Sequence, residues 1–364
     1  MKTLIIGGGA SGLYLGSLLS DATVLERNTA PGRKLSITGG GRCNYTHSGT
    51  VEEILPHYHG SRKFIKKVLY NHTPEDITAR LEALGVRTKE EEGGKRYPAS
   101  DDAGEIVRAL SSRSRIINGK ALSVERHEGL FIVRTDNGTL EAGRLVLAGG
   151  GASFPSTGSD GSLYSIARSL GHTIVPPRPA LSQITLSESL KGAEGVSLRA
   201  GLKAGKRECE GDVMITRTGL SGPAALDISR ELPGELAVSF LRGVSLDAPS
   251  KLVKNAVPLP SRLTEALLGE LAVKRCGNLS KKERSYIISR LTRFTAEAEP
   301  VWKSAMVTAG GVDTKEINAP SMESKLVKNL YFIGEIIDVD ADSGGYNLTW
   351  AFSSAYNAAK ALQP

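Results

Sequence analysis

Three glycines near the amino end of the chain have the spacing that binds the phosphates of a dinucleotide. Gly7, Gly9 and Gly12 stand in a Gly-x-Gly-x-x-Gly arrangement within the run GGGASG. In such a motif the first glycine permits a tight turn, the second lets the backbone approach a pyrophosphate, and the third lets a helix pack closely on a strand. The start of that helix presents free N–H groups and a partial positive charge to the phosphates. The spacing therefore indicates a dinucleotide site.

An acidic residue follows at the distance expected of a ribose ligand. Glu26 stands 19 residues after Gly7, directly behind the apolar run 22–25. A carboxylate at this point binds a ribose hydroxyl, and it favours NAD or FAD over NADP, whose ribose carries a phosphate. The motif alone leaves the choice between NAD and FAD open.

The elements around these residues fit a βαβ unit. Leu4–Ile6 is a short apolar run typical of a strand buried on both faces. Apolar residues then recur with a helical period over 13–19, before a second strand over 22–25. Strand, glycine turn, helix, strand and acid follow one another in order, which is more specific than a lone glycine motif.

Three further glycine-rich stretches are candidates for the same ligand. In GRKLSITGGGRCN (32–44), a flexible backbone beside Lys34 and Arg42 suits phosphate or a planar ring, although an exposed flexible loop is the alternative. RLVLAGGGASFP (144–155) is an apolar strand that ends in three glycines. SGGYN (343–347) begins a helix, whose positive end would face an electron-rich ring.

Composition limits the classes of protein and of partner. The chain has 364 residues, more than most single domains, and a net charge of +7. Its basic clusters, Lys63/Lys66/Lys67 and 281–293, have helical spacing with interleaved apolar residues, so we interpret them as solvated helix faces rather than a nucleic-acid site. The three cysteines are far apart and form no CxxC, which argues against a disulfide framework or a metal site and suits a reducing cytoplasm. No leader peptide and no membrane span is expected.

The order of expected elements indicates an α/β protein with an insertion. Helices are expected over 74–85, 102–112, 161–170, 260–293 and 348–362, with hairpins around Gly93-Gly94 and Asp136-Asn137-Gly138. Residues 183–245 carry short strand-like runs with almost no helical period. We therefore expect a Rossmann-type domain over 1–182 and 310–364, interrupted by an inserted substrate or cap domain over 183–309, β-rich over 183–250 and helical over 255–295.

Six stretches together resemble the HI0933-like family of FAD-binding oxidoreductases, within the glutathione-reductase-type flavoproteins. They are IIGGGASGL, GRKLSITGGGRCN, VLAGGGASFPSTGSDG, GLSGPA, TAGGVDTKEIN and SGGYNLTWAFSSA, and they extend over nearly the whole chain. The resemblance implies noncovalent FAD in a Rossmann-type domain built from both chain ends, and an inserted β-rich, barrel-like domain with a small helical part.

The resemblance also implies which residues bind the cofactor. The first glycine motif would hold the pyrophosphate, Glu26 the adenosine ribose, the second loop the pyrophosphate and flavin, and the last helix the flavin. Position 121, expected at the adenine, is usually larger in the family. The expected cofactor-binding residues are Gly7, Gly9, Ala10, Ser11, Gly12, Glu26, Arg27, Lys34, Gly40, Gly41, Arg42, Cys43, Asn44, Ala121, Ala148, Gly149, Gly150, Gly334, Asp338, Gly345, Tyr346 and Asn347.

The expected activity is FAD-dependent oxidation or reduction of a small organic substrate at the flavin face. The family includes amine oxidases and enone reductases, and the resemblance does not choose between them. NAD(P)H is expected only as a transient reductant, because the sequence has no second dinucleotide fingerprint. A tRNA-modifying flavoprotein and a non-catalytic redox sensor are the alternatives, with nucleic acid not favoured as a partner. The sequence assigns no catalytic residue; His57 and His59 are expected on a loop surface, and Cys43 as a packed residue rather than a redox thiol.

Overall fold

Two units divide the chain in the computed structural model, which describes residues 2–363. One comprises the residues up to Arg178 and from Val307 onward; we call it the terminal unit, because both chain ends belong to it. The other, the inserted unit, is Pro179–Met306. This confirms the expected fold class, a Rossmann-type domain built from both chain ends and interrupted by a β-rich domain.

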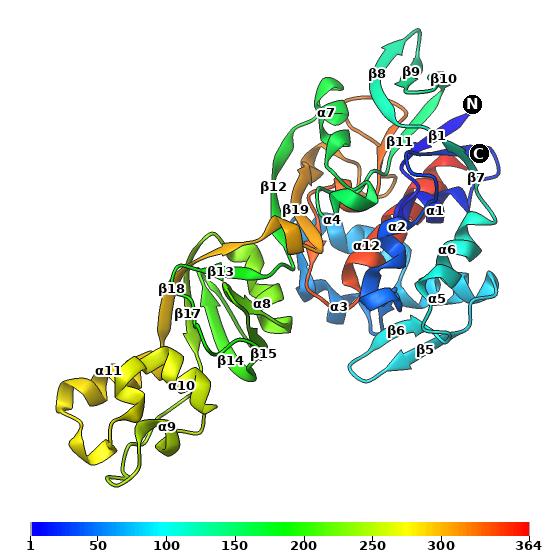
Figure 1. Ribbon diagram of the computed structural model, residues 1–364. Helices are drawn as coiled ribbons and strands as arrows, with labels where there is room; N and C mark the ends of the chain where they lie inside the picture. Colours follow the sequence, from blue (N-terminus) through cyan, green and yellow to red (C-terminus); the bar gives the residue numbers. More distant parts are fainter. Residues whose placement is uncertain (1, 364) are drawn as a thin grey trace. The chain divides into compact units, whose positions relative to one another are not determined.

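A five-stranded parallel sheet forms the centre of the terminal unit (Figure 1). The expected first strand is its middle strand; the strand that precedes Gly149 lies on one side of it, and the strand that ends at Glu26 lies on the other. Every residue of the middle strand is buried, as its continuous apolar run predicts. In order the strands are β20 (Leu330–Phe332), β11 (Arg144–Leu147), β1 (Thr3–Ile6), β2 (Ala22–Glu26) and β7 (Arg115–Asn118).

Helices pack around this sheet, and two of them begin directly after capping residues. Thr73 caps one of them with a complete capping box to Asp76, and Pro74 occupies its first turn. Asp102 caps the next helix by accepting a hydrogen bond from the N–H of Gly104; its spacing to Glu105 is that of a capping box, but no capping box forms. The helices are α1 (Ala10–Gly16), α2 (Arg33–Ser36), α3 (Val51–Ile54), α4 (Arg62–Asn71), α5 (Pro74–Ala83), α6 (Ala103–Ser111), α7 (Ser162–Ser169) and α12 (Tyr346–Leu362).

Smaller sheets complete the terminal unit. Both expected hairpins form, and each gains a third strand. The sheets are β3–β6–β5 (Thr46–His47, Lys95–Pro98, Thr88–Glu91), β8–β9–β10 (Ala121–His127, Leu130–Thr135, Gly138–Ala142), β4–β21 (Tyr58–His59, Asp340–Ala341) and β12–β19 (Ile174–Ala180, Val307–Val312).

The inserted unit is a closed six-stranded barrel followed by a helical part. A short helix, α8 (Pro223–Ile228), interrupts the region for which the sequence predicted almost no helix. The expected helical region 260–293 forms two helices joined by 3₁₀ turns. In order the barrel strands are β13 (Ile184–Leu186), β16 (Gly219–Ser221), β15 (Arg207–Ile215), β14 (Ser197–Ala204), β17 (Gly234–Ser239) and β18 (Phe294–Pro300), and the later helices are α9 (Val253–Ala256), α10 (Ser261–Leu268) and α11 (Lys281–Thr292).

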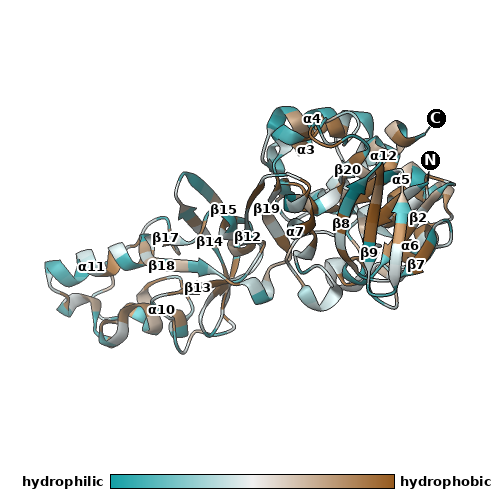
Figure 2. Cartoon of the chain, turned by 90° about the horizontal axis from the view of Figure 1, so that it is seen from above, coloured by the Kyte–Doolittle hydropathy of each residue, from teal (hydrophilic) through white to brown (hydrophobic). Residues whose placement is uncertain are grey.

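Each unit buries its own apolar core. In Figure 2 hydrophobic residues fill the strands of the parallel sheet, whereas the helices of the inserted unit alternate hydrophobic and hydrophilic residues along their length. Within residues 2–363, no helix has both the length and the apolar composition that crossing a membrane requires.

Candidate functional site

The first glycine motif forms a turn that only glycine fits. Gly7 has a φ of +112°, and a Cβ there would lie 2.4 Å from the carbonyl oxygen of Ala148. A Cβ on Gly12 would lie 1.8 Å from the carbonyl oxygen of Gly7. The turn is therefore packed directly against the end of β11, which brings Ala148 to the motif.

Open space lies on the other side of this turn. A Cβ on Gly9 would meet no heavy atom within 4 Å, and no side chain caps α1 at this residue. The first turn of α1 leaves the N–H groups of Ala10, Ser11 and Gly12 without partners inside the helix. A bare backbone facing open space is the arrangement that a pyrophosphate requires.

Glu26 holds the shape of this turn. Its Oε2 accepts a hydrogen bond from the N–H of Gly8 at 2.8 Å, and its Oε1 accepts from the N–H and the Nδ2 of Asn28 at 2.7 and 2.6 Å. A carboxylate has about four acceptor positions, so this buried one keeps about one for a hydroxyl. Arg27 points elsewhere: its guanidinium forms an ion pair with Asp160 at 2.7 Å.

The second glycine stretch turns back on itself through left-handed residues. Gly39, Gly40 and Gly41 have φ values of +57°, +69° and +90°, and a Cβ on Gly40 would meet nothing within 4 Å. Cys43 is also left-handed, at +59°, and it is buried. Burial raises the pKa of its thiol to about 12, so the sulfur stays protonated at neutral pH, as a packed residue rather than a reactive thiol would.

Lys34 joins two glycine stretches, 32–44 and 144–155, to Glu335 in the turn after β20. Its Nζ lies 2.6 Å from Oε2 of Glu335 and 2.7 Å from Oγ of Ser153. Oε1 of Glu335 accepts from the N–H of Thr308 at 2.8 Å, and Oγ1 of Thr308 accepts from the N–H groups of Ala152 and Ser153. Ser153, Thr308 and Glu335 were not assigned from the sequence; the position of Glu335 directly after Gly334 was the available signal.

Arg42 turns away from this network. Its Nε donates to Oδ1 of Asp101 at 2.8 Å, its guanidinium pairs with Glu91, and it lies over the ring of Tyr97, 4.3 Å from the centroid. These partners belong to the β5–β6 hairpin and to the loop before α6. Arg42 thus anchors the loop 38–43 in the structure, and its contact with pyrophosphate stays a prediction.

The turn after β20 meets the first glycine motif, and the last glycine stretch meets the second. A Cβ on Gly334 would lie 2.5 Å from Oγ of Ser11, and one on Gly345 would lie 2.9 Å from Oδ1 of Asn44. The Nε1 of Trp350 donates to the carbonyl of Gly334, which ties α12 to the end of β20. Segments more than 300 residues apart in the chain therefore converge at one place.

The remaining expected residues take the following positions. The side chain of Asn347 bonds the backbone of Ala341, so only its backbone is available at the start of α12. Gly149 packs on Leu163. Gly150 is left-handed, with a φ of +72°, and Asp338 bonds Val312 through its backbone N–H. Ala121 begins β8, three residues after the end of β7, and its contact with adenine stays a prediction.

A cluster of histidines beside the start of α12 was missed by the sequence. The ring of Tyr346 stacks on His57, with centroids 4.4 Å apart, and on His47, with centroids 4.8 Å apart. The carboxylate of Asp342 forms hydrogen bonds with both neighbouring histidines: its Oδ2 lies 3.2 Å from Nδ1 of His57, and its Oδ1 lies 3.0 Å from Nε2 of His59. The expectation of a loop surface is corrected here, because pairing of β4 with β21 brings these histidines to Asp342.

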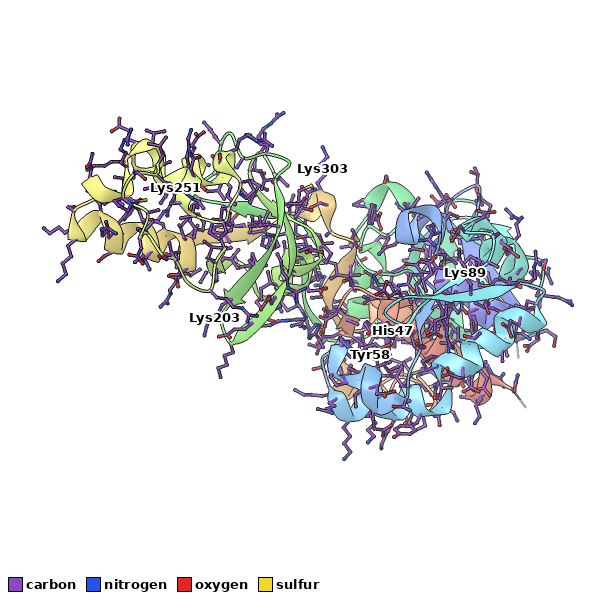
Figure 3. All side chains as sticks on the ribbon, turned by 90° about the horizontal axis from the view of Figure 1, so that it is seen from below. His47, Tyr58, Lys89, Lys203, Lys251 and Lys303 are labelled. Atoms are coloured by element: carbon purple, nitrogen blue, oxygen red, sulfur yellow. The ribbon has the colours of Figure 1, made fainter. Side chains whose placement is uncertain are left out.

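Figure 3 labels His47 and Tyr58 in this region. The hydroxyl of Tyr58 donates to the carbonyl oxygen of Tyr346 at 2.8 Å, which fixes the position of the first residue of α12. We call His47, His57, His59, Asp342 and Tyr346 the histidine cluster. Within the described part of the chain, no three His, Cys, Asp or Glu side chains are arranged to hold a metal ion.

With this geometry, comparison with known proteins decides the family. The family model described as HI0933-like protein Rossmann domain matches residues 1–361. The chain belongs to this family. It is an FAD-dependent oxidoreductase, as the resemblance implied.

Two curated relatives of this HI0933-like chain have different names. The chain is 33% identical over 398 residues to the "Ribosomal RNA dihydrouridine synthase" of Escherichia coli, in a match that covers 99% of this chain and 97% of that protein. It is 32% identical over 407 residues to the "3-dehydro-bile acid delta(4,6)-reductase" of Clostridium scindens, with 98% of each covered.

The residues of this HI0933-like chain fit FAD on structural grounds. Open space faces the backbone at Gly9 and Gly40, where a bulky anion would lie. Glu26 retains an acceptor position for a ribose hydroxyl. Oδ1 of Asn44 is buried without a hydrogen-bond partner in the structure, so it is free to accept from a bound ring.

Proposed function

We propose that this chain is an FAD-dependent reductase of a carbon–carbon double bond conjugated to a carbonyl group. The observation that carries the proposal is the near-equal identity, over almost the full length, to two relatives whose names share that chemistry. Dihydrouridine differs from uridine by saturation of a ring double bond next to a carbonyl. A Δ4,6 double-bond pair beside a 3-oxo group is likewise conjugated.

The reaction adds a hydride to the carbon β to the carbonyl and a proton to the α carbon. Reduced FAD supplies the hydride when it is bound. The balance requires a two-electron donor, for which we propose NAD(P)H. The sequence has one dinucleotide fingerprint, committed to FAD, so the nicotinamide would use the face at which the substrate reacts.

The residues of the terminal unit have separate tasks in this proposal. The backbone of Ala10, Ser11 and Gly12 binds the pyrophosphate, and Glu26 binds the adenosine ribose. Lys34 is held 2.6 Å from Glu335, so its positive charge is fixed between the glycine stretches. Gly345 and Asn44, which lie side by side, address the flavin.

The histidine cluster suits proton delivery to the α carbon. The His57 side chain is 42% exposed and can meet a substrate, whereas His59 is 18% exposed. Asp342 bonds one nitrogen of each ring and so fixes both orientations. We assign His57 as the candidate proton donor and Asp342 and His59 as positioning residues.

An anaerobic two-step experiment tests the reaction class. Holoenzyme reduced with NADPH is mixed with a 3-oxo-Δ4 steroid or with a uridine-containing RNA, and oxidised holoenzyme is mixed separately with a small amine. We expect at least one conjugated substrate to reoxidise the flavin, with a saturated product identified by mass spectrometry. Reduction of oxidised flavin by the amine, with no reoxidation by either conjugated substrate, would instead establish an amine oxidase.

A further inference from the structure

The net positive charge of the chain is equal to that of one small part of the inserted unit. Residues 251–293, which contain α9, α10 and α11 and which we call the basic helical module, carry ten Lys and Arg against three Asp and Glu, a net charge of +7. The other 321 residues carry 36 basic and 36 acidic side chains and are neutral overall. Solvated helix faces alone do not explain why the whole net charge resides in 43 residues.

Most of these cations have no carboxylate partner. Only Lys254, Lys274 and Arg290 form ion pairs, with Glu265, Glu283 and Glu188. Within residues 2–363, six exposed cations of the module form no ion pair: Lys251, Arg262, Arg275, Lys281, Lys282 and Arg293. Figure 3 shows Lys251 among the side chains that project from this module. Unpaired cations at this density attract a polyanion.

Helix α11 arranges part of this charge around an aromatic ring. Lys282 and Tyr286 are four residues apart and lie on one face of α11, and Arg293 follows as the residue that caps its C-terminus. Tyr286 is 49% exposed, and Ile288, two residues further along the helix, is 41% exposed. Exposed aromatic rings among cations stack bases while the cations bind phosphates, which is the arrangement of proteins that bind single-stranded nucleic acid.

We infer that the basic helical module binds RNA, through its phosphates and one unstacked base. This inference rests on the proposed function, since a conjugated ring within RNA is one of the two substrates that the relatives' names suggest. RNA is the partner that the inserted unit would hold. The charge count argues for a polyanion, and the exposed tyrosine argues for one that carries bases.

Salt-dependent binding of a labelled single-stranded RNA of mixed sequence tests the inference. The variant Lys281→Gln/Lys282→Gln/Arg293→Gln removes three unpaired cations. Each lost phosphate contact lowers the slope of log K against log salt by about 0.7, so the slope should fall by about 2, and affinity should fall about tenfold or more. Reduction of a 3-oxo-Δ4 steroid by the same holoenzyme variant should not change.

A matched control is available in the same unit. Arg199→Gln/Lys203→Gln/Arg242→Gln removes the same charge from exposed cations that already pair with Glu210 and Glu208. We expect this variant to lose little affinity. Equal losses in both triple variants would show that diffuse charge, not the module, attracts RNA, and would overturn the inference.

Substitution of Tyr286 separates stacking from charge. Tyr286→Ala should weaken RNA binding about tenfold with the salt slope unchanged, and Tyr286→Phe should bind as the wild type does. If the protein binds phosphatidylserine vesicles as tightly as it binds RNA, and Tyr286→Ala leaves its RNA affinity unchanged, the partner is a membrane surface instead and the inference is overturned. If the wild type reduces the steroid but binds no RNA, this inference fails and the proposed function stands. If it reduces no conjugated substrate, the proposed function itself fails.

Discussion

At the scale of single residues, Glu26 combines a structural and a binding task. It fixes the glycine turn through Gly8 and Asn28 and keeps about one acceptor position for ribose. Glu26→Ala should therefore weaken FAD binding by about 1.5–3 kcal/mol, the usual contribution of a hydrogen bond to a charged group, or roughly 10- to 100-fold in Kd. Quenching of flavin fluorescence measures this.

FMN provides the control for Glu26, because it lacks the adenosine ribose. If Glu26 binds that ribose, Glu26→Ala weakens FAD binding much more than FMN binding. An equal loss for both flavins would mean that the variant has only deformed the glycine turn, and wild-type FAD affinity would leave Glu26 with no part in binding.

Arg42 can affect flavin retention directly or through its loop. We expect Arg42→Ala to release FAD more readily during gel filtration, because its contacts with Glu91, Asp101 and Tyr97 hold the loop 38–43 in place. Asp101→Asn tests the route: it removes an anchor of Arg42 but cannot touch a pyrophosphate charge. Loss of FAD in Arg42→Ala alone supports direct contact, and undiminished retention in both variants removes the role from this loop.

Proton delivery by His57 gives a prediction for one half-reaction only. A general acid contributes roughly 100-fold or more, so His57→Gln should slow the reoxidation of reduced flavin by a conjugated substrate by about that factor. Reduction of the flavin by NADPH should keep its rate. The exposed His127→Gln is the matched control. Equal slowing of both half-reactions would indicate a structural role, and rapid-mixing absorbance distinguishes the cases.

At the scale of elements, His72 links α4 to α12 and makes stability depend on pH. The ring bonds the hydroxyl of Tyr14 at 2.6 Å and stacks on Tyr356, and its carbonyl accepts from Ser353. Burial lowers the pKa of His72 to about 4, against about 6.5 in the unfolded chain. Between these two pH values the unfolded chain binds a proton at His72 that the folded protein does not bind. The free energy of unfolding therefore falls as pH drops from about 6.5 towards 4.

The expected loss is about 3 kcal/mol of unfolding free energy over that whole window. Burial also lowers the pKa of His172, so the wild type should lose more than this one contribution. His72→Phe should be less stable at neutral pH, because Tyr14 loses its partner, but should show a shallower fall between about pH 7 and pH 5. Urea unfolding at a series of pH values measures the free energy of unfolding. If its dependence on pH is the same in His72→Phe as in the wild type, His72 is not the group responsible.

The sequence predicted the elements whose signals are local. The glycine turn, the helix start at Pro74 and the two hairpins depend on neighbours within a few residues. It missed the Lys34–Glu335 pair and the histidine cluster, because their members lie up to 301 residues apart and meet only through sheet pairing. It also gave no sign that Arg42 would turn to Asp101.

At the scale of the whole molecule, the division of tasks follows the two units. The terminal unit holds every residue expected at FAD and is built from both chain ends, so its glycine stretches converge only after the full chain has folded. The inserted unit carries a net charge of +5 through its basic helical module. In our proposals, the terminal unit therefore carries the chemistry and the inserted unit binds RNA.

The single dinucleotide fingerprint sets the order of the reaction. It is committed to FAD, so the sequence offers no second site of this kind that would hold NAD(P)H while a substrate occupies the flavin. In the proposed mechanism the nicotinamide therefore reduces the flavin and leaves before the substrate enters. Initial rates at varied NADPH and conjugated substrate should therefore give parallel double-reciprocal lines, and each substrate should inhibit competitively against the other at high concentration. Intersecting lines, with saturable NADPH reduction in the presence of bound substrate, would require a nicotinamide site separate from the substrate face.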